Sequence, residues 1–270
     1  MKIVRYQDTS GSIRYGESRA DGAVYELRGD FFATIERTEN LAGVTKILAP
    51  IDPRAIFCIG LNYRKHAEET KAKIPEFPVL FMKSPGAVQN PDDPIILPRK
   101  LASTEVDYEC ELAVVIGIAA KNVSRADALN HVLGYTCAND VSARDWQKTW
   151  GGSQWCRGKT FDTFCPLGPW IMTKDEIPDP SNLKIRTIIN GQVMQEGETS
   201  DLIFDIPTLI EFLSGSTTLL PGTVILTGTP HGVGMARTPP RWLKAGDRVS
   251  VEIDKIGTLT NPVAEENLRF

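Results

Sequence analysis

The stretch from Thr104 to Gly117 alternates acidic and apolar residues and then continues as an apolar run. Side chains on a β-strand point to opposite faces with a period of two, so a strand here has one apolar and one acidic face. The alternating residues are Glu105, Val106, Asp107, Tyr108, Glu109, Cys110, Glu111 and Leu112. The apolar run from Leu112 to Ile116 indicates that the strand enters a core.

Four carboxylates on one face of such a strand need a counter-charge. Carboxylates two residues apart lie within roughly 7 Å and repel each other, and burying an unpaired charge is costly. A hard divalent cation with oxygen ligands removes both penalties. The alternation alone is equally compatible with an exposed acidic strand, so the choice depends on the rest of the chain.

The composition argues against several classes of function. The 270 residues carry 30 Lys and Arg against 34 Asp and Glu, a balance that does not favour binding to nucleic acids or anionic membranes. No segment approaches the roughly 18 apolar residues of a membrane span. The five cysteines form no C-x-x-C pair, and the start of the chain lacks the apolar region of a signal peptide. We therefore expect a cytoplasmic protein with reduced thiols.

Turn and strand signals predict a mostly β chain with short helices, an α+β protein of two parts. Residues 1–50 form a small β-rich N-terminal domain in which 31–48 is weakly helical, and prolines in 49–53 mark its end. Residues 54–270 form the main domain. Its predicted helices start at Asn62, run from Ser124 to Gly134 and span 206–213, and Asn190-Gly191 predicts a hairpin.

Two groups of polar residues in the main domain are candidates for chemistry. His66 and Glu69 are spaced i, i+3 and share one helix face, where the carboxylate can orient the imidazole as a general base requires. A surface His–Glu pair is the plainer alternative. Asp140 at a strand end, with Arg144 and Gln147 at helical spacing, can present a carboxylate, a guanidinium and an amide to one pocket.

The order of several motifs resembles the fumarylacetoacetate hydrolase (FAH) superfamily, from about Ala55 to Pro262. One motif would be weak evidence, whereas the ordered set is specific. The loop R-G-K-T-F-D-T-F-C-P-L-G-P at 157–169 resembles the subgroup of FAH-domain-containing proteins. The motifs are Gly60-Leu61-Asn62-Tyr63 with His66, Glu109-x-Glu111, N-D-V-S-A-R-D-W-Q at 139–147, Gly158-Lys159-Thr160-Phe161-Asp162, Pro166-Leu167-Gly168-Pro169, and Thr227-Gly228-Thr229-Pro230 with Gly232-Val233-Gly234.

The resemblance implies an FAH-type mixed β-sandwich roll, usually in homodimers, with a small N-terminal domain. It implies that Glu109, Glu111 and Asp140 bind Mg²⁺ or Mn²⁺, with Ca²⁺ as a substitute, and it leaves Glu105 and Asp107 as rim charges. His66 and Glu69 become the base dyad, and Lys159 lies closest to the reacting centre. The residues that hold the substrate are then Arg144, Gln147 and Thr229, with Lys83 as a further candidate.

These roles imply a divalent-metal-dependent hydrolase that cleaves a C–C bond in acylpyruvates or other β-diketo acids through a metal-stabilised enolate. The same residues support an oxaloacetate decarboxylase or keto–enol tautomerase, or an isomerase of the 2-hydroxyhepta-2,4-diene-1,7-dioate type. A catalytically silent metal-binding module is the alternative from another class. The expected ligand is a small 2-oxo or β-diketo acid, and the 66–78 loop is a candidate lid.

Overall fold

The computed structural model describes residues 1–268, and its larger sheet has twelve strands. They run in the order β4-β3-β2-β1-β14-β12-β11-β17-β6-β7, with β5 paired to β1 and β8 paired to β14. The strands are β1 (Lys2–Asp8), β2 (Ile13–Ser18), β3 (Val24–Gly29), β4 (Ile35–Leu41), β5 (Val44–Leu48), β6 (Ala55–Gly60), β7 (Val79–Lys83), β8 (Val88–Gln89), β11 (Cys110–Ile116), β12 (Val132–Asn139), β14 (Cys165–Thr173) and β17 (Thr223–Leu226).

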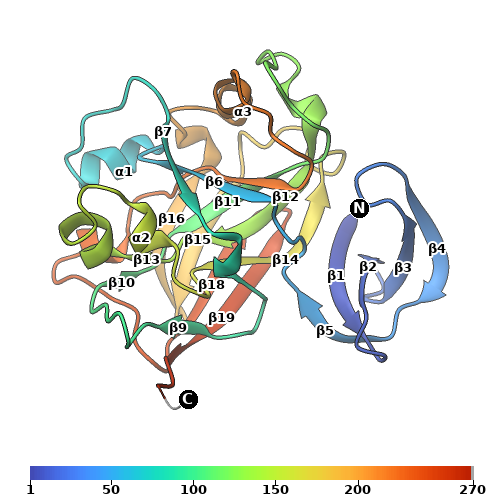
Figure 1. The fold of residues 1–270 in the computed structure, drawn as a ribbon, viewed down its shortest axis with the longest axis horizontal. Coiled ribbons are helices and arrows are strands. Elements are labelled where there is room, and N and C mark those ends of the chain that lie inside the picture. The colour runs from blue at the N-terminus through green and yellow to red at the C-terminus, as the bar shows by residue number, and fades with distance from the viewer. Residues whose placement is uncertain (269–270) are drawn as a thin grey trace.

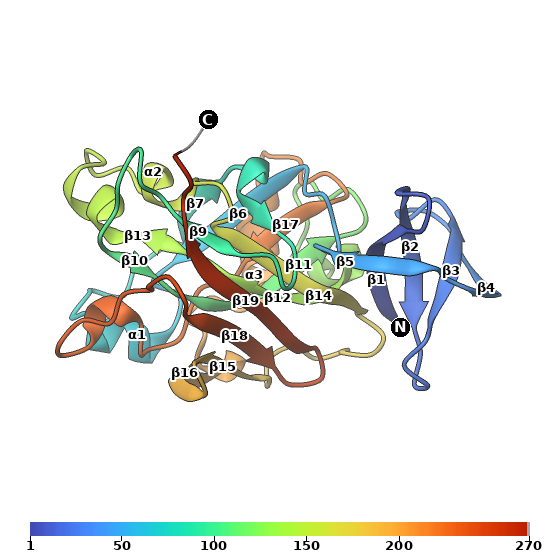
Figure 2. The same cartoon turned by 90° about the horizontal axis from the view of Figure 1, so that it is seen from below.

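A five-stranded sheet packs against β11, β12 and β14 of the larger sheet, which makes the main body a sandwich (Figures 1 and 2). Its order is β16-β15-β18-β19-β9, and a separate short ladder joins β10 to β13. The Asn190-Gly191 hairpin between β15 and β16 is confirmed. These strands are β9 (Ile95–Leu97), β10 (Val106–Asp107), β13 (Ser142–Ala143), β15 (Lys184–Ile189), β16 (Gln192–Glu198), β18 (Arg248–Ile253) and β19 (Gly257–Glu265).

Strand β11 lies at the centre of this sandwich and is buried along its whole length. Cys110, Leu112, Val114 and Ile116 face the core between the two sheets. The alternate residues Ala113 and Val115 belong to a second core on the opposite face of the large sheet. The predicted strand is confirmed from Cys110 to Ile116, where Glu111 continues the Ala113 and Val115 face. It does not extend back to Thr104, because Val106–Asp107 forms the separate strand β10, which pairs with β13.

The helices are few and short, as the mostly β reading of the sequence requires. Helix α3 confirms the prediction for 206–213, and its N-cap Asp205 accepts a hydrogen bond from the Thr208 N–H. No helix within residues 1–268 is long and apolar enough to cross a bilayer. The helical elements are α1 (Arg64–Glu69), α2 (Cys156–Lys159), α3 (Ile206–Ser214), the 3₁₀ turns η1 (Pro85–Ala87), η2 (Ala128–His131), η4 (Thr199–Asp201) and η5 (Gly234–Ala236), and the π-helical η3 (Asp145–Thr149).

The N-terminal strands β1–β5 lie to one side of the sandwich (Figures 1 and 2), and the weak helix predicted for 31–48 is wrong. Strand β4 pairs with β3 and β5 pairs with β1, so neighbouring strands supply the hydrogen bonds of this segment. Strand β1 also pairs with β14, which makes the large sheet continuous across the boundary predicted near residue 50. The division into two domains stays a prediction.

Two further helix predictions need correction. The segment predicted as a helix from Ser124 to Gly134 contains only the short turn η2 before β12 begins, and Gly134 lies inside that strand. A Cβ at Gly134 would meet the Met172 carbonyl oxygen at 2.2 Å, so close strand packing explains this glycine. Helix α1 starts after Tyr63, and the Asn62 side chain instead donates to the Phe204 and Thr227 carbonyls.

Candidate metal centre and active site

The paired strands β11 and β12 bring three carboxylates to one point. Glu111 lies in β11, Glu109 precedes it, and Asp140 directly follows β12, where its N–H donates to the Glu109 carbonyl oxygen. One carboxylate oxygen from each of the three residues lies within 4.8 Å of the others, and all three side chains are buried. The sequence prediction that these residues converge is confirmed in its geometry.

Three cations surround this carboxylate cluster but contact only two of its members. Lys159 Nζ donates to Glu109 Oε2 and Asp140 Oδ2, both at 2.7 Å. A guanidinium nitrogen of Arg144 reaches Glu109 Oε1 at 2.6 Å, and Lys83 Nζ reaches Asp140 Oδ1 at 2.6 Å. Burial alone would raise the pKa of Glu109, but Arg144 and Lys159 outweigh it and hold that pKa well below its usual value.

Glu111 is the carboxylate of the cluster that has no cationic partner within residues 1–268. Its Oε2 accepts a hydrogen bond of 2.7 Å from the Gly228 N–H. Burial, followed by repulsion from Asp140 and Glu109, raises the pKa of Glu111 well above its usual value. Gly228 adopts a φ of +103°, and a Cβ there would meet Asn62 at 2.8 Å, so glycine is required at this donor.

This arrangement fits a hard divalent cation. The donors are carboxylate oxygens, they converge on one point, and Glu111 is a buried acid that forms no ion pair within residues 1–268. Mg²⁺ and Mn²⁺ both prefer such oxygen ligands, and the cluster does not choose between them. Glu109, Glu111 and Asp140 are thus the residues that would hold the ion.

The predicted His66–Glu69 pair forms on α1. His66 Nδ1 lies 2.7 Å from Glu69 Oε1, and the other oxygen of Glu69 accepts a hydrogen bond of 2.9 Å from the Gly232 N–H. His66 is 7% exposed, so the plainer reading of a surface pair is wrong. An ionised Glu69 can only accept a hydrogen bond, so Nδ1–H of His66 donates to it. Nε2 of the neutral ring is then free to accept a proton.

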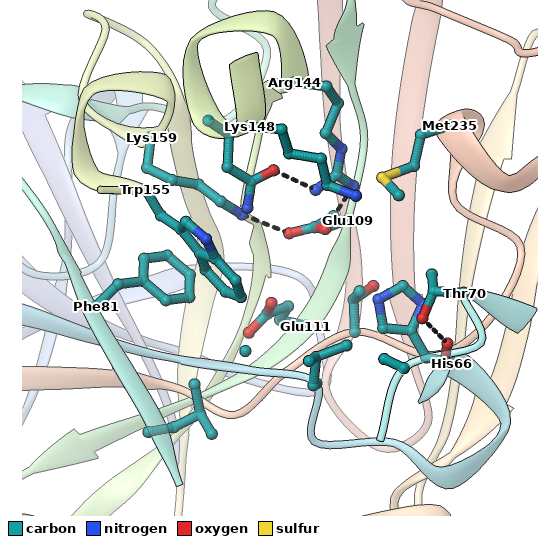
Figure 3. A pocket seen from close by; sticks show the side chains of 16 residues that line it. His66, Thr70, Phe81, Glu109, Glu111, Arg144, Lys148, Trp155, Lys159 and Met235 are labelled. Atoms are coloured by element: carbon teal, nitrogen blue, oxygen red, sulfur yellow. Dashed lines mark hydrogen bonds and ion pairs between the residues drawn. The ribbon is translucent and has the colours of Figure 1, made fainter. Parts of the chain in front are cut away.

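A cavity of about 170 Å³ lies between the His66–Glu69 pair and the carboxylate cluster (Figure 3). Glu69, Asp140 and Lys83 are not among its lining residues and stand behind them. Phe81 and Trp155 form an aromatic wall, with ring centroids 5.4 Å apart. Of the predicted site residues, those that line the cavity are His66, Glu109, Glu111, Arg144, Gln147, Lys159 and Thr229.

Arg144 is held on three sides. Its Nε donates to Asp107 Oδ2 at 2.9 Å, and one terminal nitrogen donates to Gln147 Oε1 at 2.9 Å in addition to the Glu109 contact. The prediction of Asp107 as a rim charge is wrong, because Asp107 is fully buried. Its carboxylate also accepts from the backbone N–H groups of Gly234 and Met235. Asp107 therefore links the Arg144 guanidinium to the backbone of η5.

Lys159 reaches the cluster because α2 packs directly on the segment that carries Arg144 and Gln147. A Cβ at Gly158 would lie 2.6 Å from both the Ala143 carbonyl oxygen and the Gln147 nitrogen. The ammonium group of Lys159 also sits 4.8 Å from the Phe81 ring centroid. Burial disfavours the charged lysine, yet Asp140 and Glu109 raise its pKa overall.

Of the two further residues predicted to contact the substrate, Thr229 lines the cavity and Lys83 does not. The Thr229 hydroxyl donates to the Cys110 carbonyl and accepts from Gln195 Nε2, so it already has two protein partners. Lys83 is fully buried between Asp140 and the Val141 carbonyl. We therefore assign to Lys83 the role of positioning Asp140. The Thr229 hydroxyl has limited remaining hydrogen-bonding capacity for a ligand.

Sequence reasoning missed Gln195, Lys148 and the aromatic wall. Gln195 Oε1 accepts hydrogen bonds from the Cys110 N–H and the Thr187 hydroxyl, and so links β16 to β11. Trp155 packs so close to Gly60 that a Cβ there would meet its ring at 2.3 Å. These residues come from separate strands and loops, and no local motif groups them.

Comparisons with known proteins agree with this geometry. Residues 55–264 match the family described as fumarylacetoacetate (FAA) hydrolase, C-terminal. The chain is 52% identical over 218 residues to a mitochondrial oxaloacetate tautomerase of Xenopus laevis, covering 80% of this chain and 68% of that protein. A human mitochondrial oxaloacetate tautomerase is 49% identical over 217 residues, with the same two shares covered.

Two solved structures share the whole fold. A 2-hydroxyhepta-2,4-diene-1,7-dioate isomerase from Mycobacterium marinum matches with a TM-score of 0.85 and 40% identity over 99% of each chain. A 5-carboxymethyl-2-hydroxymuconate delta-isomerase from Mycobacterium smegmatis matches with a TM-score of 0.86 and 41% identity, over 98% of this chain and all of that one. The predicted sandwich roll with an N-terminal extension is confirmed at the level of the fold.

Proposed function

Because the chain belongs to the fumarylacetoacetate hydrolase family, we propose that it catalyses keto–enol tautomerisation of a small 2-oxo acid, with oxaloacetate as the first candidate. The observation that carries the proposal is the placement of His66 on a small cavity beside three converging carboxylates. The activity named for the Xenopus and human relatives supports it.

Tautomerisation moves a proton between C3 of the acid and the oxygen of its 2-oxo group, so it needs a base near C3 and positive charge near that oxygen. The Nε2 atom of His66 is free to take the C3 proton, while Glu69 holds Nδ1 and stabilises the imidazolium that results. The same nitrogen can return the proton to oxygen or to carbon.

The positive charge comes from buried groups on the opposite wall. A bound divalent cation would supply Lewis acidity at the substrate oxygens. Lys159 and Arg144 are preorganised donors beside Glu109, and such donors contribute roughly 3–4 kcal/mol each to transition-state stabilisation. Gln147 fixes the Arg144 guanidinium, which keeps this charge in place during proton transfer.

The enol absorbance of oxaloacetate tests the proposal. The protein with Mg²⁺ or Mn²⁺ should accelerate the interconversion of keto and enol forms, EDTA should abolish the effect, and His66→Ala should lower it by roughly 10²- to 10⁴-fold. Absence of acceleration in the wild type, or an undiminished rate in His66→Ala, would count against the proposal. Absence of acceleration in the wild type would also favour the silent metal-binding module.

Hydrolysis of acylpyruvates was the main interpretation of the sequence, and it stays a prediction. The same dyad can activate water, but the relatives named as tautomerases and the small cavity favour the isomerisation alternative. Ligand pockets for drug-sized molecules are about 300–1,000 Å³, so a cavity of about 170 Å³ suits a short acid better than a long acyl chain. Loss of acetylpyruvate absorbance identifies the hydrolase, and pyruvate release from oxaloacetate identifies the decarboxylase.

The remaining expectations from the sequence are parts of the same proposal. We propose a homodimer, which light scattering after size-exclusion chromatography tests. Cytoplasmic location stays a prediction, and the word mitochondrial in the names of the vertebrate relatives makes fractionation of the source cells the relevant check. The lid role of the 66–78 loop also stays a prediction.

A further inference from the structure

One cation on the cavity wall has no role in the proton transfer proposed above. Lys148 lines the cavity and extends from η3 beside Arg144 and Met235 (Figure 3). Arg144 and Lys159 are each bound to carboxylates of the protein. Within residues 1–268, the ammonium group of Lys148 has no hydrogen-bond or ion-pair partner.

The surroundings of Lys148 favour an incoming anion. Burial, followed by repulsion from Arg144, lowers the pKa of Lys148, while Glu109, Asp107 and Glu105 act in the opposite direction. Lys148 is an exposed residue on the cavity wall, so its ammonium group is open to an incoming ligand. A carboxylate of a ligand would pair with this ammonium group without displacing any protein contact.

The cavity is small enough for one ligand to contact both the carboxylate cluster and Lys148. A 2-oxo acid whose carboxylate and oxo oxygens face the carboxylate cluster fills much of a volume of about 170 Å³. Arg144 spans from Glu109, at 2.6 Å, to the side of the cavity where Lys148 lies. Because Lys148 lines the same small cavity as Glu109 and Glu111, a second carboxylate on such a ligand can meet Lys148.

We propose that Lys148 is a specificity-determining residue that binds the distal carboxylate of a 2-oxo dicarboxylic acid and so selects dicarboxylates over monocarboxylates. This inference rests on the proposed function, because it assumes that the 2-oxo acid end binds at the carboxylate cluster. It assigns no proton-transfer role to Lys148.

The test uses two ligands that cannot tautomerise. Binding of malate and lactate, a dicarboxylic and a monocarboxylic 2-hydroxy acid, is measured calorimetrically with Mg²⁺ for the wild type, Lys148→Gln and Lys121→Gln. Lys121 is an exposed lysine outside the cavity and serves as the matched control. We expect the wild type to prefer malate and Lys148→Gln to lose roughly three- to tenfold of that preference, with lactate affinity unchanged.

The Lys121→Gln variant should retain the wild-type ratio of malate to lactate affinity. A wild type that does not discriminate between the two acids, or a Lys148→Gln variant with the wild-type ratio, overturns the inference. Oxaloacetate turnover by the same proteins is a separate readout. A Lys148-dependent malate preference without turnover supports the inference while it rejects the tautomerase proposal. Turnover of oxaloacetate together with a wild-type malate-to-lactate ratio in Lys148→Gln supports the tautomerase proposal and rejects the inference.

Discussion

At the scale of single residues, Glu111 connects the sequence pattern most directly to a bound cation. It is the cluster carboxylate that lacks a cationic partner within residues 1–268, and its pKa is raised by burial, Asp140 and Glu109. Its alternation with Cys110 and Leu112 followed from the sequence, whereas its isolation from Lys159 and Arg144 is a property of the folded site.

Replacing Glu111 separates metal binding from folding. Without metal, Glu111→Gln should be at least as stable as the wild type, because a repelled buried carboxylate is removed. Mg²⁺ at 100 times its Kd should stabilise the wild type by about 2.7 kcal/mol and the variant far less. Thermal melts with and without Mg²⁺ measure both effects. Glu68→Gln, an exposed neighbour of the His66–Glu69 pair, is the control, and equal Mg²⁺ responses in all three proteins would contradict the assignment.

Asp107 gives a second prediction at this scale. Asp107→Ala leaves Arg144 Nε and the Gly234 and Met235 N–H groups without their acceptor. Removing one partner of a buried ion pair typically costs about 3–5 kcal/mol, so urea denaturation should show a loss of that order. Asp107→Asn keeps one acceptor oxygen and should lose less. Equal stability of Asp107→Ala and the wild type would restore the rim-charge interpretation.

At the scale of elements, the contact between α2 and η3 sets the position of Lys159. Gly158 makes this contact possible because its missing Cβ leaves room for the Ala143 and Gln147 backbone. The sequence marked this glycine as part of a motif, but the reason for it is the close packing of two successive short helices. The site is therefore sensitive to small displacements of a four-residue helix.

Gly158→Ala should displace α2 and lower the turnover of oxaloacetate by roughly 10²-fold, the usual consequence of misplacing a catalytic group by about 1 Å. The Tm should change much less than the rate constant. Gly86→Ala is the matched control, because the nearest atom to a Cβ there is the Ser84 hydroxyl oxygen at 3.5 Å. If Gly158→Ala keeps full turnover, Lys159 does not depend on this packing.

At the scale of the whole molecule, the N-terminal strands share both a sheet and a core with the main body. Ile3 of β1 pairs with Ile171 of β14, and both residues are fully buried in the second core. Removal of the first five strands would open the edge of β14 and expose this core, and exposed edges of that kind promote aggregation.

Deletion of residues 1–50 should therefore give protein that aggregates or melts at a clearly lower temperature. Ile3→Ala in the full chain should cost about 2–5 kcal/mol in the free energy of unfolding, with the exposed Ile13→Ala near zero as the control. Chemical denaturation and size-exclusion chromatography measure these outcomes. A deletion variant that does not aggregate, is fully active and is as stable as the full chain would show that residues 51–270 form an independent domain.

The sequence by itself predicted the features that follow from local pattern. Period-two alternation put Glu111 on the opposite face of β11 from Cys110 and Leu112, Asn190-Gly191 predicted a hairpin, and the i, i+3 spacing put His66 beside Glu69. The ordered motifs indicated the family. These predictions succeed because each depends on residues within one element or on a short turn.

The tertiary structure decided which of these groups meet and what surrounds them. Strand pairing converts 124–134 from a predicted helix into a turn and a strand, and β10 next to η5 buries Asp107 against Arg144. Among the residues that the structure describes, the same packing leaves Glu111 without an ion pair and the Lys148 ammonium group without a partner at one small cavity. Burial and counter-charge depend on segments distant in the chain, so charge pairing in this site follows from the fold and not from any local pattern.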